Sequence, residues 1–441
     1  MTKSVKIILI TLFLFQMFIS CGFELAHDEA YYWLFSRHLD WGYFDHPPFV
    51  ALIIKLFSFL PKSEFSVRIG FIFLQFASAI ILLNLTSYNL ISLLLFFSFP
   101  LASFAGIFAL PDTPLLFLTA CYAYQLRKYL DNDSLKNSIY LSAIISCLLY
   151  AKYHGILLII FTILAIPKLF LKKSFYITAA LSILFLLPHL WWQYQHGFPT
   201  FQYQLFERPS AAFSFKRSIE YLGTEMILAG FLSGPITWLI VLRLKTKSLF
   251  ERSLKFISFG TIIFFLLSSF TKKIEANWSV FLTIPIIYLS HSSNIWKKEK
   301  IKYLLWISFF IVLSFRVVLI LPPNSLGIKR LSEFHGWRNW AYQLQNKCGN
   351  YPIMANSYQI ASKLSYYLNR EIGALNYHSR RNHFDFWRFD LKIKTLTKKV
   401  CYITDKKEFH GELITSPDGK TMRIVKNESI DRLWELKLNQ R

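Results

Sequence analysis

The feature that most limits what this chain can fold into is a series of long apolar segments. Segments of about 18 or more apolar residues are typical of helices that cross a membrane. The 441 residues are 54% hydrophobic, which is more than the core of a soluble domain needs. The sequence therefore predicts a polytopic α-helical membrane protein with about eleven transmembrane helices. We expect these spans at residues 4–20, 66–86, 88–109, 114–130, 138–151, 154–171, 174–192, 220–242, 256–271, 278–291 and 303–321.

The basic residues set the expected orientation of these spans. The formal net charge is +23, and Lys and Arg cluster at 127–136, 172–173, 243–255 and 296–302. Basic clusters beside spans mark the cytoplasmic side, and no nucleic-acid-binding motif accompanies them. Residues 4–20 are also compatible with a signal peptide, but the many later spans favour an uncleaved first span. The N-terminus is then cytoplasmic and, after an odd number of spans, the C-terminal tail lies outside.

The tail differs from the rest of the chain because its hydropathy drops after a Pro-Pro-Asn sequence. Residues 351–355 and 399–404 have the pattern of short strands, and residues 357–368 have that of an amphipathic helix. We therefore expect a small α/β domain at residues 322–441.

The remaining residues 1–321 form the expected transmembrane domain, with its first outer loop at 22–64. Two of the five cysteines, Cys348 and Cys401, lie in the tail. They can form a disulfide if the tail lies outside the cytoplasm.

Charged and titratable residues from four separate connections fall on the outer side of the expected spans. A set that is scattered in sequence but gathered on one membrane face suggests a single site. The inward connections carry mostly basic anchors and no such set. The outer residues are Asp28, Glu29, His46, Asp112, Lys152, His154 and Glu275.

The first outer loop has the densest group of functional residue types. Asp28 and Glu29 are candidates for a general base or for ligands of a hydroxyl group or a metal. The alternative is a solvated helix start, since an acid in the first turn favours the helix dipole. His46 precedes two prolines and is a candidate phosphate contact or proton shuttle, although it also fits a packed turn histidine. His27, His38 and His46 with Asp28 leave a divalent metal possible, but without helical ligand spacing.

The other candidates each have a structural alternative. Asp112 stands before Thr-Pro, where an N-cap is equally natural. Lys152, His154 and Arg68 are candidate contacts of a lipid phosphate, and their alternative is snorkelling at the interface. Glu275 is a candidate substrate contact that can instead pair with Lys272 or Lys273.

These motifs together resemble those of a known group of membrane enzymes. The chain resembles bacterial glycosyltransferase families 39 and 83, which have the GT-C fold and include the dolichyl-phosphate-mannose-protein mannosyltransferase-like, aminoarabinose and galacturonosyl transferases. The resemblance covers nearly the whole chain, and the motif in the first outer loop is specific. The matching segments are Asp28–Trp33, Trp41–Pro48, Leu110–Pro114, Ala151–His154, Glu275–Trp278, Gly336-Trp337, Tyr358–Ser362 and Arg381–Trp387.

The resemblance implies an inverting sugar transferase in the inner membrane. The donor would be a polyprenyl-phosphate sugar, and the acceptor would be lipid A, another envelope glycan or a protein, on the periplasmic face. Asp28 matches the first-loop Asp of the family, and Asp112 matches its second acid. His46 stands where aminoarabinose transferases have a lysine, which favours the galacturonosyl-like branch. Lys152, Arg68 and His46 would stabilise the departing phosphate.

Two other classes of protein are compatible with parts of this pattern. A transporter or flippase also has many spans, but the acids lie at one surface and no inverted repeat is visible. A non-catalytic assembly protein would tolerate Asp28→Asn. The sequence has no P-loop, dinucleotide fingerprint or GxSxG motif, so chemistry driven by a soluble nucleotide is unsupported.

Overall fold

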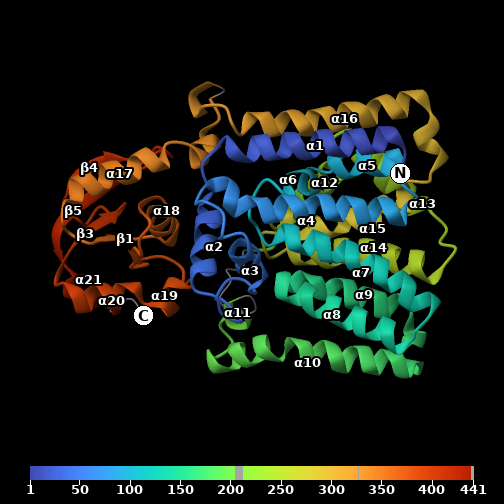
Figure 1. Ribbon diagram of the computed structural model, residues 1–441, viewed down its shortest axis with the longest axis horizontal. Coiled ribbons are helices and arrows are strands. Elements are labelled where there is room, and N and C mark those ends of the chain that lie inside the picture. The colour runs from blue at the N-terminus through green and yellow to red at the C-terminus, as the bar shows by residue number, and fades with distance from the viewer. Residues whose placement is uncertain (204–211, 326, 439–441) are drawn as a thin grey trace.

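The protein consists of a helical bundle, a small layer of helices at one end of it, and a mixed α/β unit beyond that layer (Figure 1). The computed structural model describes residues 1–203, 212–325 and 327–438. Most bundle helices run side by side along the longest axis, and the chain's N-terminus lies at the end far from the α/β unit. The fold therefore separates a long apolar part from a polar one.

The bundle contains helical structure at all eleven predicted spans. Seven spans are single helices: α1 Lys3–Cys21, α4 Glu64–Leu85, α7 Asp112–Asp131, α8 Leu135–Ala151, α10 Lys173–Gln195, α14 Leu249–Ser269 and α16 Glu299–Val318. The other four are broken: α5 Leu90–Ser98 with α6 Pro100–Ala105, η1 Tyr153–Gly155 with α9 Ile156–Ala165 and η2 Pro167–Leu171, α12 Phe215–Leu228 with α13 Gly234–Arg243, and η4 Ala276–Leu282 with α15 Thr283–Ser290. A further short helix, η5 Asn294–Lys297, precedes α16.

Two of the breaks have clear local causes. Phe99 is extended because a following proline disfavours helical backbone, so α5 ends before Pro100. Gly230, at φ 111°, separates α12 from α13 and adopts a conformation that other residues rarely reach. The expectation of continuous helices at 88–109 and 220–242 was therefore wrong.

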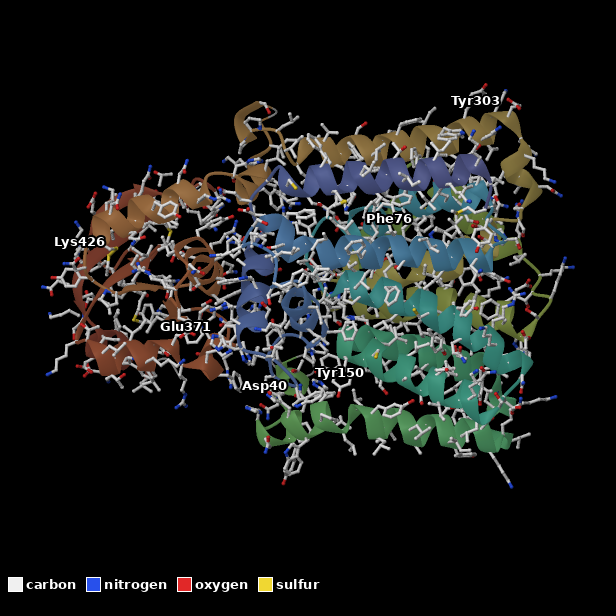
Figure 2. All side chains as sticks on the ribbon, viewed as in Figure 1. Asp40, Phe76, Tyr150, Tyr303, Glu371 and Lys426 are labelled. Atoms are coloured by element: carbon white, nitrogen blue, oxygen red, sulfur yellow. A yellow bond between two sulfur atoms is a disulfide. The ribbon has the colours of Figure 1, made fainter. Side chains whose placement is uncertain are left out.

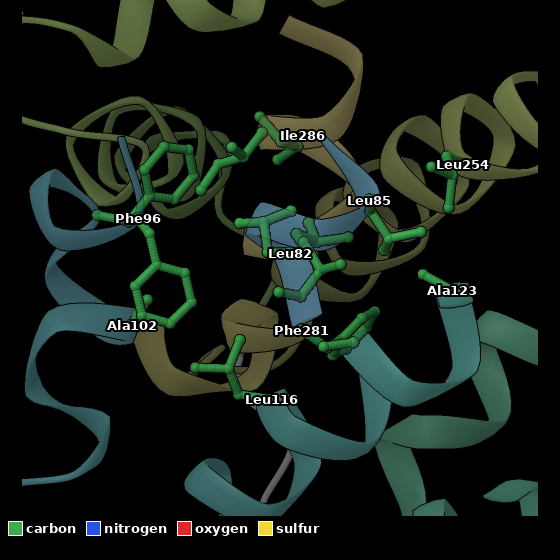
Figure 3. Packing of buried hydrophobic residues seen from close by; sticks show 14 of the residues in the cluster. Leu82, Leu85, Phe96, Ala102, Leu116, Ala123, Leu254, Phe281 and Ile286 are labelled. Carbon is green, nitrogen blue, oxygen red and sulfur yellow. The ribbon is translucent and has the colours of Figure 1, made fainter. Parts of the chain in front are cut away.

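The surface of the bundle is apolar where a membrane would cover it. Four helices, α1, α4, α10 and α16, are long and apolar enough to cross a membrane. Large apolar side chains point outward on α1, α10 and α16, including Leu14, Leu184 and Phe310. Inside the bundle, Leu82, Phe96 and other side chains pack closely (Figure 3). An apolar exterior around an apolar core identifies a membrane protein.

The helices between the bundle and the α/β unit come from the first outer loop and from the segment after α10. They are α2 His27–Arg37, α3 Phe49–Leu56 and α11 Pro199–Gln202 (Figure 1). The α2 helix packs against a helix of the α/β unit. Buried residues of the loop and the tail, such as Tyr31 and Leu364, share one apolar cluster. The first outer loop is therefore held between two larger parts of the molecule.

The α/β unit has a five-stranded sheet in the order β2-β1-β3-β5-β4. Strand β1 is parallel to β2 and β3, whereas β5 is antiparallel to β3 and β4. The strands are β1 Ile353–Ala355, β2 Gly373–Ala374, β3 Lys399–Thr404, β4 Glu412–Thr415 and β5 Thr421–Ser429. The helices are η6 Pro323–Ser325, η7 Lys329–Phe334, α17 Trp337–Cys348, α18 Tyr358–Leu368, α19 Phe384–Trp387, α20 Phe389–Leu396 and α21 Ile430–Leu438.

Three elements predicted for this unit are confirmed, and the disulfide that the sequence left open is formed. Strand β1 lies within the predicted 351–355, β3 spans 399–404, and α18 follows the N-cap Ser357. Cys348 and Cys401 form a disulfide between α17 and β3. Since both sulfur-bearing side chains are buried, the bond lies inside the apolar cluster rather than at the surface.

Candidate active site

The adjacent acids Asp28 and Glu29 occupy the first turn of α2 but face different surroundings. Glu29 is fully buried, whereas the side chain of Asp28 is exposed to solvent. Successive residues of a helix point about 100° apart, so neighbours in sequence need not share an environment. This difference assigns the two carboxylates to different tasks.

Glu29 forms a buried ion pair with Arg68 of α4. The Nε and Nη2 atoms of Arg68 lie 2.8 and 2.7 Å from the two carboxylate oxygens, and neither side chain is exposed. Arg68 also donates to the carbonyls of Ser20, Phe23 and Glu24. All five N–H groups of the guanidinium are thus used.

The carboxylate of Glu29 is equally well satisfied. It accepts hydrogen bonds from the backbone N–H groups of Ala26, at 2.8 Å, and Ala109, at 2.9 Å. The pair therefore ties the start of α2 to α4 and to the chain just before α7. Because neither group has a free hydrogen-bonding position, we do not carry the predicted substrate roles of Glu29 and Arg68 forward.

Asp28 retains a carboxyl group that can act on a ligand. The protein around the Asp28 carboxyl partly replaces its water shell. This desolvation, followed by the negative charges of Glu333 and Asp45, raises the pKa of Asp28 to about 6. The structure thus places this carboxyl where solvent reaches it but the ionised form is less favoured than in water. A carboxylate with a raised pKa is a stronger proton acceptor.

Asp112 is the centre of a second polar group, built from three connections of the bundle. It is the first residue of α7 and makes no capping hydrogen bond. Instead, Lys152 lies 2.7 Å from its Oδ1 atom, and Asn277 donates to Oδ2 at 3.0 Å. The N-cap alternative is therefore wrong, and three separate connections of the bundle meet at Asp112.

His46 and Asp45 link the first outer loop to both polar groups. His46 packs its ring against the edge of Tyr32. Burial, followed by the charges of Lys152 and Arg380, lowers the pKa of His46 to about 3, so its imidazole is neutral at physiological pH. Asp45 accepts a hydrogen bond of 2.7 Å from Tyr31 and pairs with Arg380 of the tail at 2.5 Å.

Tyr32 of α2 is influenced by the charges of several of these groups. Burial raises the pKa of its phenol, and the charges of Asp28, Asp45 and Asp112 raise it further. Three carboxylates from two connections thus act on one phenol. Burial raises the pKa of Tyr358 of α18, and the charges of Asp28 and Asp45 raise it further. The Tyr358 hydroxyl accepts a hydrogen bond from Arg380 at 3.2 Å. The site therefore includes groups from the tail as well as from the bundle.

Two predicted residues lie outside this polar group. Glu275 is exposed and forms an ion pair with Lys273 at 3.3 Å, which is one of the expected alternatives. His154 packs its ring 4.8 Å from that of Trp278 and 5.8 Å from that of Phe265. Of the predicted segment Glu275–Trp278, Asn277 rather than Glu275 reaches Asp112.

The three loop histidines are spread over different parts of the site. His27 contacts Trp337, His38 pairs with Glu371, and His46 contacts Tyr32. Within the described ranges, no three His, Cys, Asp or Glu side chains are grouped so that they could hold a metal ion. No metal-ligand set can therefore be named from these side chains.

Sequence reasoning missed Arg380, Asp45 and Asn277 as members of the site. Asp45 and Asn277 were inside the matched motifs, so the polar character of Asp45 beside His46 and of Asn277 near Glu275 was the available signal. Arg380 stands directly before the matched tail segment, but nothing local places it against Asp45. Only the packing of the tail on the first loop brings these two together.

One cavity beside this site is mostly apolar. It has a volume of about 540 Å³ and is lined by Leu39, Asp40, Trp41, Pro48, Phe49, Leu52 and Tyr150. Asp40 and Tyr150 lie where the bundle meets the first-loop helices (Figure 2). Tyr150 precedes Lys152 by two residues, so the cavity opens close to the second polar group.

Comparison with known proteins gives three kinds of similarity. A family model described as dolichyl-phosphate-mannose-protein mannosyltransferase matches residues 45–192. That segment contains Asp45, His46, Asp112 and Lys152. The chain is also 21% identical over 365 residues to the lipid A galacturonosyltransferase RgtD of Rhizobium johnstonii, covering 77% of each chain.

Two solved structures share the fold. The chain superimposes on ArnT from Cupriavidus metallidurans in the apo state with a TM-score of 0.67 and 13% identity, covering 95% of this chain and 97% of that one. The same protein bound to undecaprenyl phosphate gives a TM-score of 0.68 and 14% identity, covering 96% and 98%. The bundle, the first-loop helices and the α/β unit all fall within this match.

Proposed function

We propose that this chain, which is a membrane glycosyltransferase with the GT-C fold, transfers a sugar from a polyprenyl-phosphate carrier to lipid A. The observation that carries the proposal is that the charges of Asp28 and Asp112 both act on the phenol of Tyr32, while Lys152 pairs with Asp112 at 2.7 Å. The similarity to a lipid A galacturonosyltransferase supports the acceptor, and the match to a structure bound to undecaprenyl phosphate supports the donor. These similarities favour transfer over transport.

Lys152 and His46 are the groups that we assign to the donor phosphate. The ammonium of Lys152 has three N–H groups, of which one is directed at Asp112. The other two can donate to the phosphate on which negative charge develops as the sugar leaves. His46 is neutral and acts as a hydrogen-bond donor rather than a cation. Asp112 and Asn277 hold the Lys152 ammonium in place.

Asp28 is the group that we assign to the acceptor. Its carboxylate, with a pKa of about 6, accepts the proton of an attacking hydroxyl. If a phosphate group of the acceptor attacks instead, no proton has to be removed and Asp28 only positions it. Attack on the face opposite the departing phosphate inverts the anomeric carbon. Glu29 and Arg68 position α2 and do not touch the substrate.

We place the reaction on the periplasmic face of the inner membrane, with the N-terminus in the cytoplasm. The Cys348–Cys401 disulfide supports this orientation, because disulfides persist in oxidising compartments. Residues 1–321 then carry the reaction, and residues 322–441 close over it from outside. The apolar cavity beside Tyr150 has room for part of a lipid chain.

The test is sugar transfer in inner-membrane vesicles that carry wild type or Asp28→Asn at equal amounts. Isotope-labelled polyprenyl-phosphate sugars serve as donors, beginning with galacturonic acid because of the Rhizobium relative. Mass spectrometry of lipid A and of core oligosaccharide identifies the product. We expect a labelled lipid A with wild type and none with Asp28→Asn.

Asp131→Asn is the matched control, since it removes an exposed carboxylate at the other end of α7. It is expected to transfer sugar like wild type. Equal product from Asp28→Asn and wild type would remove Asp28 from the mechanism. No product from wild type with any of these donors would contradict the transferase proposal itself.

A further inference from the structure

A second cavity, which is polar, lies in the α/β unit, apart from the groups around Asp28 and Asp112. Its volume is about 200 Å³. Its lining comes from the ends of β1 and β3, the first turn of α18, the β4–β5 turn and the start of α2. The lining residues are His27, Trp337, Asn356, Ser357, Gln359, Ile360, Asp405, Asp418, Lys420 and Met422.

The topology of the sheet explains why a cavity forms here. Strand β1 lies between its two parallel neighbours, β2 and β3. The chain passes from β1 to β2, which is the neighbour of β1 on one side. The connection that follows β2 then crosses to β3, which is the neighbour of β1 on the other side. Between two parallel strands whose connections diverge in this way, the carboxyl ends leave a crevice that binds ligands in many α/β folds. Asn356 follows β1 and Asp405 follows β3 at that crevice.

The charges around the cavity argue against an anionic ligand. Lys420 forms an ion pair with Asp418 at 2.8 Å, which cancels the charge of both. Asp405 remains as an exposed carboxylate, and Ser357 already caps the first turn of α18. The lining therefore carries a net negative charge and offers carboxylate, amide and hydroxyl groups. These groups bind hydroxyls well, and a phosphate or carboxylate poorly.

The size of the cavity and its apolar wall further limit the kind of ligand that can bind. A volume of 200 Å³ corresponds to about seven water molecules, at roughly 30 Å³ each, which suits a single sugar ring. Trp337 supplies an aromatic wall. His27 also lines the cavity.

We propose that this cavity is a second binding site, for one uncharged, hydroxyl-rich saccharide unit. Asp405 and Gln359 hold its hydroxyls, and Trp337 covers one face of its ring. The occupant contacts His27, the residue that precedes Asp28 on α2. A saccharide bound here therefore sits against the same helix that presents the proposed base, while the transfer reaction takes place elsewhere.

The test uses the full-length protein, purified in a detergent that has no sugar headgroup. Methyl glucoside is the neutral probe, and methyl glucuronide is its anionic counterpart with the same ring. Saturation-transfer NMR measures the binding of both. We expect saturable binding of methyl glucoside, at least tenfold weaker binding of methyl glucuronide, and at least tenfold weakening of methyl glucoside by Asp405→Ala or Gln359→Ala.

Two control variants keep the result specific to the cavity. Glu408→Ala removes an exposed acid of the same unit outside the cavity, and Asp28→Asn alters the proposed transfer site. Both are expected to bind methyl glucoside like wild type. Absence of binding by wild type, unchanged binding by both cavity variants, preference for methyl glucuronide, or loss of binding in Asp28→Asn would each overturn the proposal.

Discussion

Two buried ion pairs at the end of the bundle nearest the α/β unit differ in one decisive respect. In the Glu29–Arg68 pair, every N–H of the guanidinium and both carboxylate oxygens have partners, and no atom is exposed. In the Asp112–Lys152 pair, the ammonium has a single carboxylate partner and both side chains keep slight exposure, 10% and 6%. The first pair is saturated, whereas the second can still bind something.

This difference separates structural from chemical roles better than residue type does. Both pairs join segments distant in sequence, and both lie beside the first outer loop. A buried guanidinium whose donors are all used can only hold parts together, because a ligand would have to displace existing bonds. A lysine with unused donors can stabilise charge that appears during a reaction.

Arg68→Met tests the saturated pair and is expected to have the largest effect. It leaves the Glu29 carboxylate buried without its counter-ion, and breaking a buried pair in this way costs about 3–5 kcal/mol. We expect a strong loss of folded protein, measured by thermal unfolding in detergent. Replacing both members, in Glu29→Leu with Arg68→Met, should recover part of that stability.

Lys216→Met is the control for this prediction. Lys216 also pairs with a glutamate, Glu220, but the two side chains are 87% and 63% exposed. An exposed pair contributes about 1 kcal/mol or less, so little change is expected. A folded but inactive Arg68→Met would return Arg68 to the substrate-binding role predicted from the sequence.

Lys152→Gln tests the unsaturated pair. Removing a donor from developing charge typically lowers the turnover number by about 10²–10³, and we expect a fall of that size in the vesicle assay. Stability should fall less than in Arg68→Met, because Asp112 keeps Asn277 and lies at the N-terminus of α7. A loss of folded protein equal to that of Arg68→Met would show that both pairs mainly stabilise the fold.

The pH dependence of transfer tests Asp28, the group that the saturated pair positions. The deprotonated carboxylate accepts the proton, and the pKa of Asp28 is about 6. Activity should therefore be retained above pH 6 and fall about tenfold per pH unit below it. The residual activity of Asp28→Asn should lack this step.

The titration of Lys363 must be distinguished from that of Asp28 in the pH dependence of sugar transfer. Burial lowers its pKa to about 7, and it donates to the carbonyl of Glu333 at 2.7 Å. If the fall in activity is centred near pH 7 and is absent in Lys363→Met, the pH dependence belongs to Lys363 rather than to Asp28.

Asn277→Ala is expected to have the smallest effect. It removes the 3.0 Å hydrogen bond to Asp112 but leaves the ion pair with Lys152. A net contribution of about 1 kcal/mol corresponds to roughly a fivefold lower turnover number, with KM unchanged. Asn294→Ala, at an exposed position between α15 and α16, should behave like wild type. A rise in KM alone would mean that Asn277 contacts the substrate directly.

Most of the fold could be predicted from the sequence because it depends on local patterns. Long apolar runs determined where the bundle has helices, and a short apolar run with β-branched and aromatic residues determined β3. The Pro-Pro boundary and the two tail cysteines also pointed to a separate outer region. Continuous helices were wrongly expected where Pro100 and Gly230 interrupt the backbone, although both residues were visible signals.

The sequence by itself determined that acids and bases from several connections gather at one end of a membrane bundle. The order of the spans is enough for that, since successive spans carry their flanking residues to alternate ends of the bundle. Only the tertiary structure decided which of them are free to act. Asp28 and Glu29 are neighbours, yet helix geometry and the position of Arg68 bury one and leave the other open to solvent. Arg380 reached Asp45 through long-range packing of the tail, and no local pattern encodes that contact.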